Sequence, residues 1–244
     1  SHIYLNNEGK GLVPQADGLS RRVRDIGRRF SGEDGDRFLA AGASKTIASY
    51  VLQRLLKSFE QASSWLPEAQ VANSRDLCDL VASFALDAAL VESETEHPEL
   101  TFEPWLEDRM VVAAQRGHPL ADGRKHPVEA LRSERWILRE ADSGTRQYFE
   151  CNLAPLLRPG RRTAFTLSSP QTILGMVGEG LGITFISGLL ASQPEFGARH
   201  AVIRLDREFS RTFSLCWHPL KYHSLSMAQF LEYCRAWNPE NAGD

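Results

Sequence analysis

Two kinds of apolar pattern alternate along most of this chain, and that alternation restricts its fold more than any other feature. A strand predicted at Phe38–Ala41 precedes an amphipathic helix, and a strand predicted at Glu68–Ala72 precedes another, which leads into an apolar strand at 88–91. Parallel neighbours need a long crossover between them, so this repetition predicts a parallel sheet. The apolar helix faces are Ile47, Val51, Leu52, Leu55, Leu56 and Phe59, and then Leu77, Leu80, Val81 and Phe84.

A second strand and helix series follows a stretch rich in proline and charge, Glu94–Asp108, which we expect to be a break between two lobes. Helices are predicted after Gly144 and from Pro170. A final strand at 213–217 precedes a helix that periodicity alone assigns to neither lobe. The strands expected in this series are 110–114, 136–138, 164–167 and 183–186, and the last helix buries Met227, Phe230, Leu231 and Cys234.

Length and composition agree with two lobes and an appendage. A chain of 244 residues with 42% hydrophobic content can fill two cores. The net charge of −3 argues against a general nucleic-acid surface, because binding phosphates requires a concentrated basic excess. The opening residues lack the apolar core of a signal peptide, and no apolar run is long enough to cross a membrane. We therefore expect a cytoplasmic protein with no membrane partner.

The first 36 residues carry a different pattern. Six apolar residues repeat at spacings of four and three, which places them on one narrow stripe of a helix. Such a stripe packs either on the chain's own globular domain or on a second copy of the chain, and its narrowness favours the second copy. The polar, glycine-containing segment 31–36 then ends the helix. The stripe consists of Leu12, Ala16, Leu19, Val23, Ile26 and Phe30.

Polar turns between strands and helices are where a ligand is expected, because helix N-termini there present free N–H groups. Four such turns are predicted: 44–46, 73–74, 142–146 and 168–171. Helix capping alone accounts for most of their Ser, Thr and Asn residues. It does not account for Lys45 and Arg146, which place positive charge in a first helical turn, where the helix dipole disfavours it. A bound anion would offset that cost; the alternative is that both side chains point to solvent.

The other motifs in the sequence indicate no cofactor, catalytic or metal site. The glycines of 178–182 follow a helix and precede a strand, the reverse of the order in a dinucleotide-binding loop, so they indicate a helix end and a tight turn. Ser143 lacks the surroundings of a catalytic nucleophile. The seven histidines and four cysteines show no metal-ligand spacing. We expect no cofactor, no metal and no catalysis.

Five short motifs, in order, give the chain a resemblance to LysR-type transcriptional regulators over nearly its whole length. They lie at the beginning of the N-terminal stripe and in the strands, turns and helices of the α/β series. They are Leu5-Asn6-x-x-Gly9 with Leu12-x-Pro14, Gly42-Ala43-Ser44-x-Thr46-Ile47, Gly117-His118-Pro119-Leu120, Trp136-Ile137-x-Arg139-Glu140-x-x-Ser143-Gly144-Thr145-Arg146, and Val177-x-x-Gly180-Leu181-Gly182-Ile183.

The resemblance implies an α/β fold of two Rossmann-like lobes, as in type 2 periplasmic binding proteins, preceded by a linker helix for dimerisation. Residues 1–6 would be a remnant of a winged helix-turn-helix and 7–36 the linker helix and hinge. Lobe I would comprise 37–109 and 216–244, and lobe II 110–215. A small effector, anionic if the cations at 45 and 146 contact it, would bind in the cleft between the lobes. Carried over by position, its contacts would be Ser44, Lys45, Thr46, Asn73 and Ser74 in lobe I and Ser143, Thr145, Arg146 and Ser169 in lobe II.

The resemblance also implies dimers that pair into tetramers. The recognition helix of the family is not in the sequence, so we expect operator DNA to be bound only through that missing helix-turn-helix. Two alternatives stay open at this point. A solute-binding protein of a transporter would share the cleft but would need export, and an α/β enzyme would need a proton-transfer constellation that cannot be assembled from these residues.

Overall fold

The computed structural model describes residue 23 and residues 37–92, 97–157, 162–191, 193 and 196–239. These residues divide into two compact units. Unit 1 contains the described residues up to Val91, those from 97 to 105 and those from 214 to 239. Unit 2 contains Glu92 and the described residues from 106 to 213. The predicted lobe boundaries near residues 109 and 215 stay predictions.

Unit 1 is built on three parallel strands, with β1 between β2 and β3. Ser44 of β1 is in register with Ala72 of β2, so the two strands end at the same edge. This confirms the parallel sheet predicted from the strand and helix alternation. The strands are β1 (Ala40–Ser44), β2 (Glu68–Ala72) and β3 (Ala88–Glu92), whose last residue belongs to unit 2.

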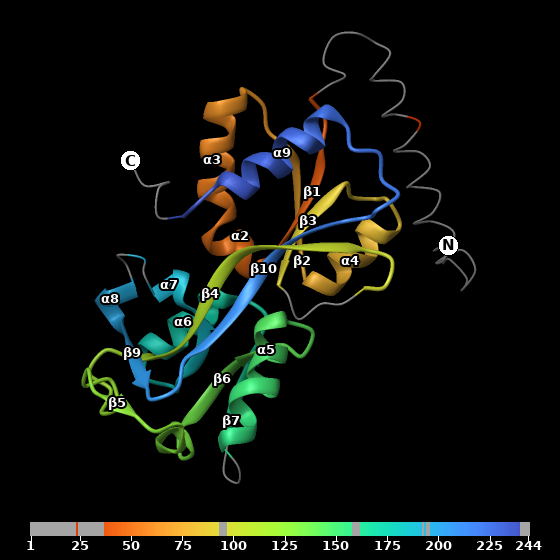
Figure 1. The fold of residues 1–244 in the computed structure, drawn as a ribbon. Helices are drawn as coiled ribbons and strands as arrows, with labels where there is room; N and C mark the ends of the chain where they lie inside the picture. The colour runs from red at the N-terminus through yellow and green to blue at the C-terminus, as the bar shows by residue number, and fades with distance from the viewer. Residues whose placement is uncertain are drawn as a thin grey trace, which may run out of the picture. The chain divides into compact units, whose positions relative to one another are not determined.

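Helices lie on both sides of these strands, with α3 and α9 together on one side and α4 on the other (Figure 1). Phe59 of α3 packs edge-on against Phe230 of α9, with ring centroids 5.3 Å apart. Leu77 and Val81 of α4 are fully buried beneath β1. The helices are α2 (Lys45–Tyr50), α3 (Leu52–Ser63), α4 (Ser74–Ala82) and α9 (Leu225–Ala236).

Unit 2 contains antiparallel as well as parallel strands. β4 pairs antiparallel with both β8 and β9, β5 pairs parallel with β9, and β6 pairs parallel with β7. β4 and β10 each begin in one unit and end in the other. The strands are β4 (Thr101–Gln115), β5 (Lys125–His126), β6 (Arg135–Arg139), β7 (Arg162–Leu167), β8 (Thr184–Ser187), β9 (His200–Leu205) and β10 (Phe209–Trp217).

Neighbouring residues of β6 bury their side chains on opposite faces, as strand geometry requires. Trp136 packs against Phe149, with centroids 4.9 Å apart, and Ile137 packs against Ile173 and Val177 of α6. Helices therefore cover both faces of β6. The helical elements of unit 2 are a 3₁₀ turn (Val128–Leu131), α5 (Gly144–Tyr148), which continues as a π-helical turn (Phe149–Leu153) and a 3₁₀ turn (Ala154–Leu157), α6 (Pro170–Gly178), α7 (Gly188–Ala191) and α8 (Phe196–Arg199).

Two expectations from the sequence are wrong. The proline-rich stretch 94–108 is not a break throughout, because β4 already begins at Thr101. Trp105 explains this: its indole Nε1–H donates to the carbonyl of Cys234 at 2.6 Å, and this tertiary contact outweighs the unfavourable local composition. Phe84 is not part of the apolar face of α4, since that helix ends at Ala82 and Phe84 has a φ of 59°.

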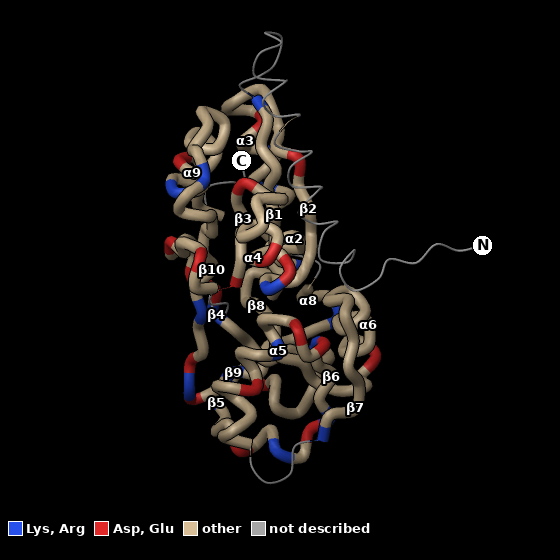
Figure 2. The backbone as a smooth tube through the Cα atoms, turned by 90° about the vertical axis from the view of Figure 1, so that its right-hand side faces the viewer, with Lys and Arg blue, Asp and Glu red and all other residues tan. Residues whose placement is uncertain are grey.

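The predicted linker helix and wing remnant lie outside the described residues, apart from Val23. That residue is helical and 68% exposed. Acidic and basic residues are interspersed along the described chain (Figure 2). No helix in the described part of the chain is long and apolar enough to cross a membrane.

Gly182 offers a test of the packing between β6 and β8. A Cβ at this position would overlap the carbonyl oxygen of Arg135, which accepts a hydrogen bond from the N–H of Ile183 at 2.8 Å. We expect Gly182→Ala to lower the free energy of unfolding by about 1–3 kcal/mol in urea titrations. Gly175→Ala is the matched control, because its Cβ would meet nothing within 4 Å. It should leave stability unchanged or raise it by up to about 1 kcal/mol. Equal effects of the two substitutions would contradict the close approach.

Candidate functional site

The polar turns of unit 1 meet at the edge where β1 and β2 end. Because Ser44 is in register with Ala72, the turn at 44–46 lies beside Asn73 and Ser74. The structure therefore brings together all five residues proposed for this half of the site. Ser44, Thr46 and Ser74 are buried, whereas Lys45 and Asn73 are half-buried.

Capping accounts for only part of this polar set. The Ser44 hydroxyl accepts a hydrogen bond from the N–H of Ile47 at 3.3 Å, which makes it the N-cap of α2. Asn73 occupies the N-cap position of α4, yet its side chain makes no capping hydrogen bond. Lys45 follows the cap in the first turn of α2, where no acidic residue is present. The dipole of α2 thus disfavours this cation, as the sequence indicated.

In unit 2 the turns after β6 and β7 also lie at one edge, since Arg139 is in register with Leu167. Ser169 is the N-cap of α6: its hydroxyl accepts from the N–H of Thr172 at 3.3 Å. Ser143 behaves differently. It is buried at the N-cap position of α5, and its hydroxyl has no hydrogen-bond partner among the residues that the structure describes.

Arg146 already has acceptors within unit 2. Its Nε–H donates to Glu150 at 2.7 Å, and its Nη1–H donates to the carbonyl of Arg139 at 3.1 Å. The side chain is 18% exposed. The carboxylate of Glu150 thus compensates the charge of Arg146 in the first turn of α5, so this cation does not require an external anion.

Beside this turn lies a buried ionic cluster that the sequence did not indicate. Arg211 of β10 has a side chain with no exposed surface. It donates from Nε to Asp108 at 2.8 Å and from Nη1 to Glu92 at 2.5 Å. Nη1 also lies 3.2 Å from the hydroxyl of Thr145. The hydroxyl of Ser187 donates to the second oxygen of Asp108 at 2.5 Å.

The cluster determines what can sit at the start of α5. Any side chain at position 144 would overlap the Glu92 carboxylate, so Gly144 is what lets that carboxylate approach the helix. Two acidic groups face one buried cation, which makes the region unfavourable for a further anion. Nη2 of Arg211 makes no hydrogen bond to the described part of the chain, and neither does the Ser143 hydroxyl. Both can donate a hydrogen bond to an oxygen.

Burial also affects proton binding in this cluster. Removal from water raises the pKa of Asp108, and this outweighs the opposing effects of Arg211 and of the Ser187 hydrogen bond. Within the described ranges, no group of three acidic, histidine or cysteine side chains could hold a metal ion.

One sequence signal could have located this cluster. Phe209, Arg211 and Phe213 alternate along a strand, so a charged residue shares the inward face with two aromatic residues. Such a charge is buried only when it is paired. The sequence could not identify the acids, because Asp108 and Glu92 are distant along the chain.

Comparisons with known proteins cover both units. The family model of the LysR substrate binding domain matches residues 37–239. The chain is similar to the uncharacterized HTH-type transcriptional regulator YeiE of Escherichia coli strain K12, with 33% identity over 236 residues, 95% of this chain and 78% of that protein. It is also similar to the HTH-type transcriptional regulator CysL of Bacillus subtilis strain 168, with 34% identity over 151 residues, 61% of this chain and 50% of that protein.

A solved structure extends the likeness to the fold. The regulatory domain of CcmR from Synechocystis PCC6803, in complex with 2-PG, is 27% identical to this chain and covers 82% of it, with a TM-score of 0.74. The match covers 96% of that domain. These comparisons confirm the predicted fold class of two α/β lobes like those of periplasmic binding proteins.

Because the pKa of Asp108 is raised, the contribution of this residue to stability changes with pH in a defined direction. The folded state binds this proton more tightly than the unfolded state, so the contribution of Asp108 to stability falls as the pH rises through the folded-state pKa. We expect the unfolding free energy of the native chain minus that of Asp108→Asn to decrease from about pH 4 toward neutrality.

Asp122→Asn is the control with the opposite sign. The pKa of Asp122 is lowered mainly by a hydrogen bond from the N–H of Arg124, and to a smaller extent by one from His126. Its contribution is present above the unfolded-state pKa and is lost as the pH falls, so the same difference should increase with pH. Urea titrations of the three proteins across this range measure both slopes. A flat difference for Asp108→Asn would show that its pKa is not raised.

Proposed function

Because the chain belongs to the LysR-type family of transcriptional regulators, we propose that it binds a small metabolite and that binding changes how the whole regulator acts on its operator. The family match over both units carries this proposal. Regulators of this family bind small-molecule effectors and DNA. The match favours a regulator over a solute-binding protein of a transporter.

We propose that residues of both units contact the effector, with different roles. Ser44, Lys45 and Thr46 would contact an anionic group, which is supported by the cation in the first turn of α2 and by the N–H groups there. Asn73 and Ser74 would add hydrogen bonds, since they lie beside that turn.

In unit 2 the effector would present an uncharged oxygen. The buried acids outnumber Arg211, so a second anionic group would be repelled there. The hydroxyl of Ser143 would contact that oxygen. Thr145, Arg146 and Ser169 would orient the turns, since each already has a hydrogen-bond partner in unit 2.

The remaining parts of the proposal concern the whole regulator. Operator DNA would be bound by a helix-turn-helix outside this sequence, in a homodimer or homotetramer of cytoplasmic chains. The family consists of regulators, not enzymes, and we propose no catalytic role for this chain. The lobes would comprise residues 37–109 with 216–244, and residues 110–215.

A thermal-shift screen tests the anionic effector. Sulfate, phosphate, 2-PG and small carboxylates are compared with neutral analogues, and one anion should raise the melting temperature selectively. Lys45→Met and Thr46→Val should each weaken binding of that anion roughly tenfold, which corresponds to about 1.4 kcal/mol. Lys57→Met, an exposed lysine on α3, is the matched control and should leave the affinity unchanged. An anion bound equally well by all four proteins would remove the α2 turn from the site.

The apolar stripe at the N-terminus generates a separate test. Leu19→Asp with Ile26→Asp places two charges on the stripe, and charges there oppose helix pairing. We expect sedimentation velocity to show a smaller assembly than the native chain forms. Arg21→Asp with Arg28→Asp is the control, because the heptad spacing places both on the helix side opposite the stripe. An unchanged assembly in the first variant would mean that the stripe does not mediate association.

A further inference from the structure

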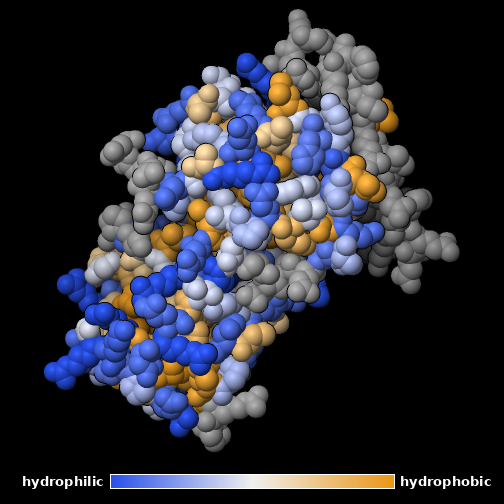
Figure 3. All heavy atoms as spheres, viewed as in Figure 1, coloured by the Kyte–Doolittle hydropathy of each residue, from blue (hydrophilic) through white to orange (hydrophobic). Residues whose placement is uncertain are grey.

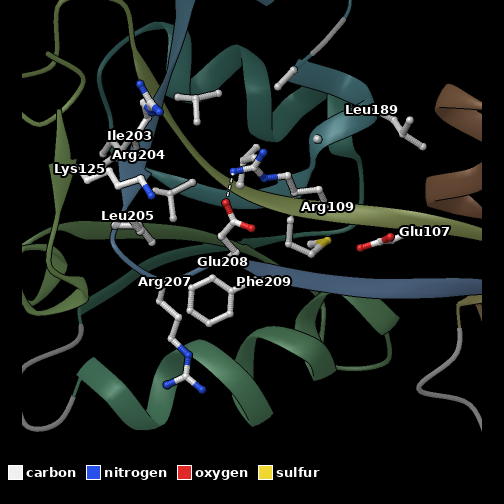
Figure 4. Close-up of a pocket in the computed structure, with 16 residues that line it drawn as sticks. Glu107, Arg109, Lys125, Leu189, Ile203, Arg204, Leu205, Arg207, Glu208 and Phe209 are labelled. Atoms are coloured by element: carbon white, nitrogen blue, oxygen red, sulfur yellow. Dashed lines mark hydrogen bonds and ion pairs between the residues drawn. The ribbon is translucent and has the colours of Figure 1, made fainter. Parts of the chain in front are cut away.

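Unit 2 contains a pocket of about 640 Å³ that shares no residue with the proposed effector site. Strands β4 and β9, helix α7, β5 and the start of β10 form its walls (Figure 4). Its volume lies in the range of pockets that bind small molecules. Every lining residue belongs to unit 2.

Apolar side chains form one part of the lining. Val112 and Ile203 are in register and point into the core, so Val111 and Val202 point away from it and line the pocket. Leu189 of α7 adds a further apolar side chain. Helix α7 lies close to β4 because Gly188 has no side chain: a Cβ there would be 2.6 Å from the carbonyl oxygen of Arg109. Hydrophobic side chains also lie among strongly hydrophilic ones in the lower part of Figure 3.

Two adjacent cations are the decisive feature. Lys125 of β5 and Arg204 of β9 are register partners in a parallel strand pair, so two basic side chains start from neighbouring positions of the sheet. Both are exposed, so solvent screens most of their mutual repulsion, but together they attract an anion to this end of the pocket. Neither residue forms an ion pair with the described residues, and the guanidinium of Arg204 donates only to the carbonyl of Gly123, at 3.2 Å. In Figure 4 the Lys125 side chain extends from β5 into the pocket.

Other charges around the pocket do not neutralise this pair. The lining holds four basic residues and two acidic ones: Arg109, Lys125, Arg204, Arg207, Glu107 and Glu208. Glu208 pairs with Arg109 at 3.1 Å, and both side chains are about two-thirds exposed. An ion pair so exposed is weak, and Arg109 can exchange Glu208 for another carboxylate at little cost.

We propose that this pocket binds a small amphipathic anion. Its apolar body lies on Val111, Val202 and Leu189, and its single carboxylate or phosphate lies between Lys125 and Arg204. The two cations attract the anionic group, and the apolar wall favours an anion that carries an apolar body over one that does not. The pocket is thus a second ligand site, independent of the effector site.

Octanoate is the probe for the test. Acetate serves as the carboxylate without a long apolar chain, and 1-octanol as the uncharged analogue with that chain. We expect octanoate to bind saturably in calorimetry, acetate not to bind, and 1-octanol to bind more weakly than octanoate. Lys125→Glu with Arg204→Glu should weaken octanoate binding by roughly tenfold or more. Arg132→Glu reverses an exposed arginine of the same unit outside the pocket and should leave the affinity unchanged.

Three further results separate this pocket from the effector site and from a protein interface. Lys125→Met alone should weaken octanoate binding while leaving the melting temperature without ligand nearly unchanged, since both cations are exposed. Thr46→Val should bind octanoate normally; a loss there would place the probe at the effector site and overturn the proposal. Equal binding to the charge-reversal variant and to Arg132→Glu would also overturn it. So would a change of oligomeric state in the variant without any loss of octanoate affinity, because the surface would then serve a protein partner.

Discussion

Unit 2 depends on one buried cation. Arg211 lies between Glu92 and Asp108, and a charge with no exposed surface is tolerated only beside such partners. Glu92 ends β3, Asp108 lies in β4 and Arg211 in β10, so one set of ion pairs fixes three strands. Thr145 and Ser187 bring the beginnings of α5 and α7 into the same network. The proposed contacts of unit 2 are therefore positioned by charges that do not themselves bind the effector.

Serines in equivalent turns play different physical roles. Ser44 and Ser169 accept hydrogen bonds from the N–H groups of their own helices, as ordinary N-caps do. Ser143 occupies a cap position, is buried, and makes no hydrogen bond within the described residues. The same residue type in the same kind of turn thus stabilises a helix at two positions and offers a free donor at a third. Their hydrogen-bond partners separate the roles, whereas their sequence context does not.

Local patterns predicted some elements well and failed for others. Both ends of the strand Glu68–Ala72 were predicted correctly, because turn residues flank it and a helix with clear apolar periodicity follows. The beginning of β4 was missed, because Pro104 and the nearby acidic residues are unfavourable for a strand. The strand nevertheless forms, since Trp105 donates a hydrogen bond to α9. The strand β9 was also missed. It forms by pairing with β4 and β5, which are far away in the sequence, and such pairing produces no recognisable pattern in the local sequence.

The sequence alone determined the α/β fold, the parallel order of the first strands and the family, because apolar periodicity and turn residues act over a few positions. It also located the polar turns. Only the tertiary structure decided that Arg146 is neutralised by Glu150, that Arg211 is buried between two acids, and that Lys125 stands beside Arg204. Electrostatic energies depend on distance and burial between residues remote in sequence, and those quantities exist only once the chain has folded.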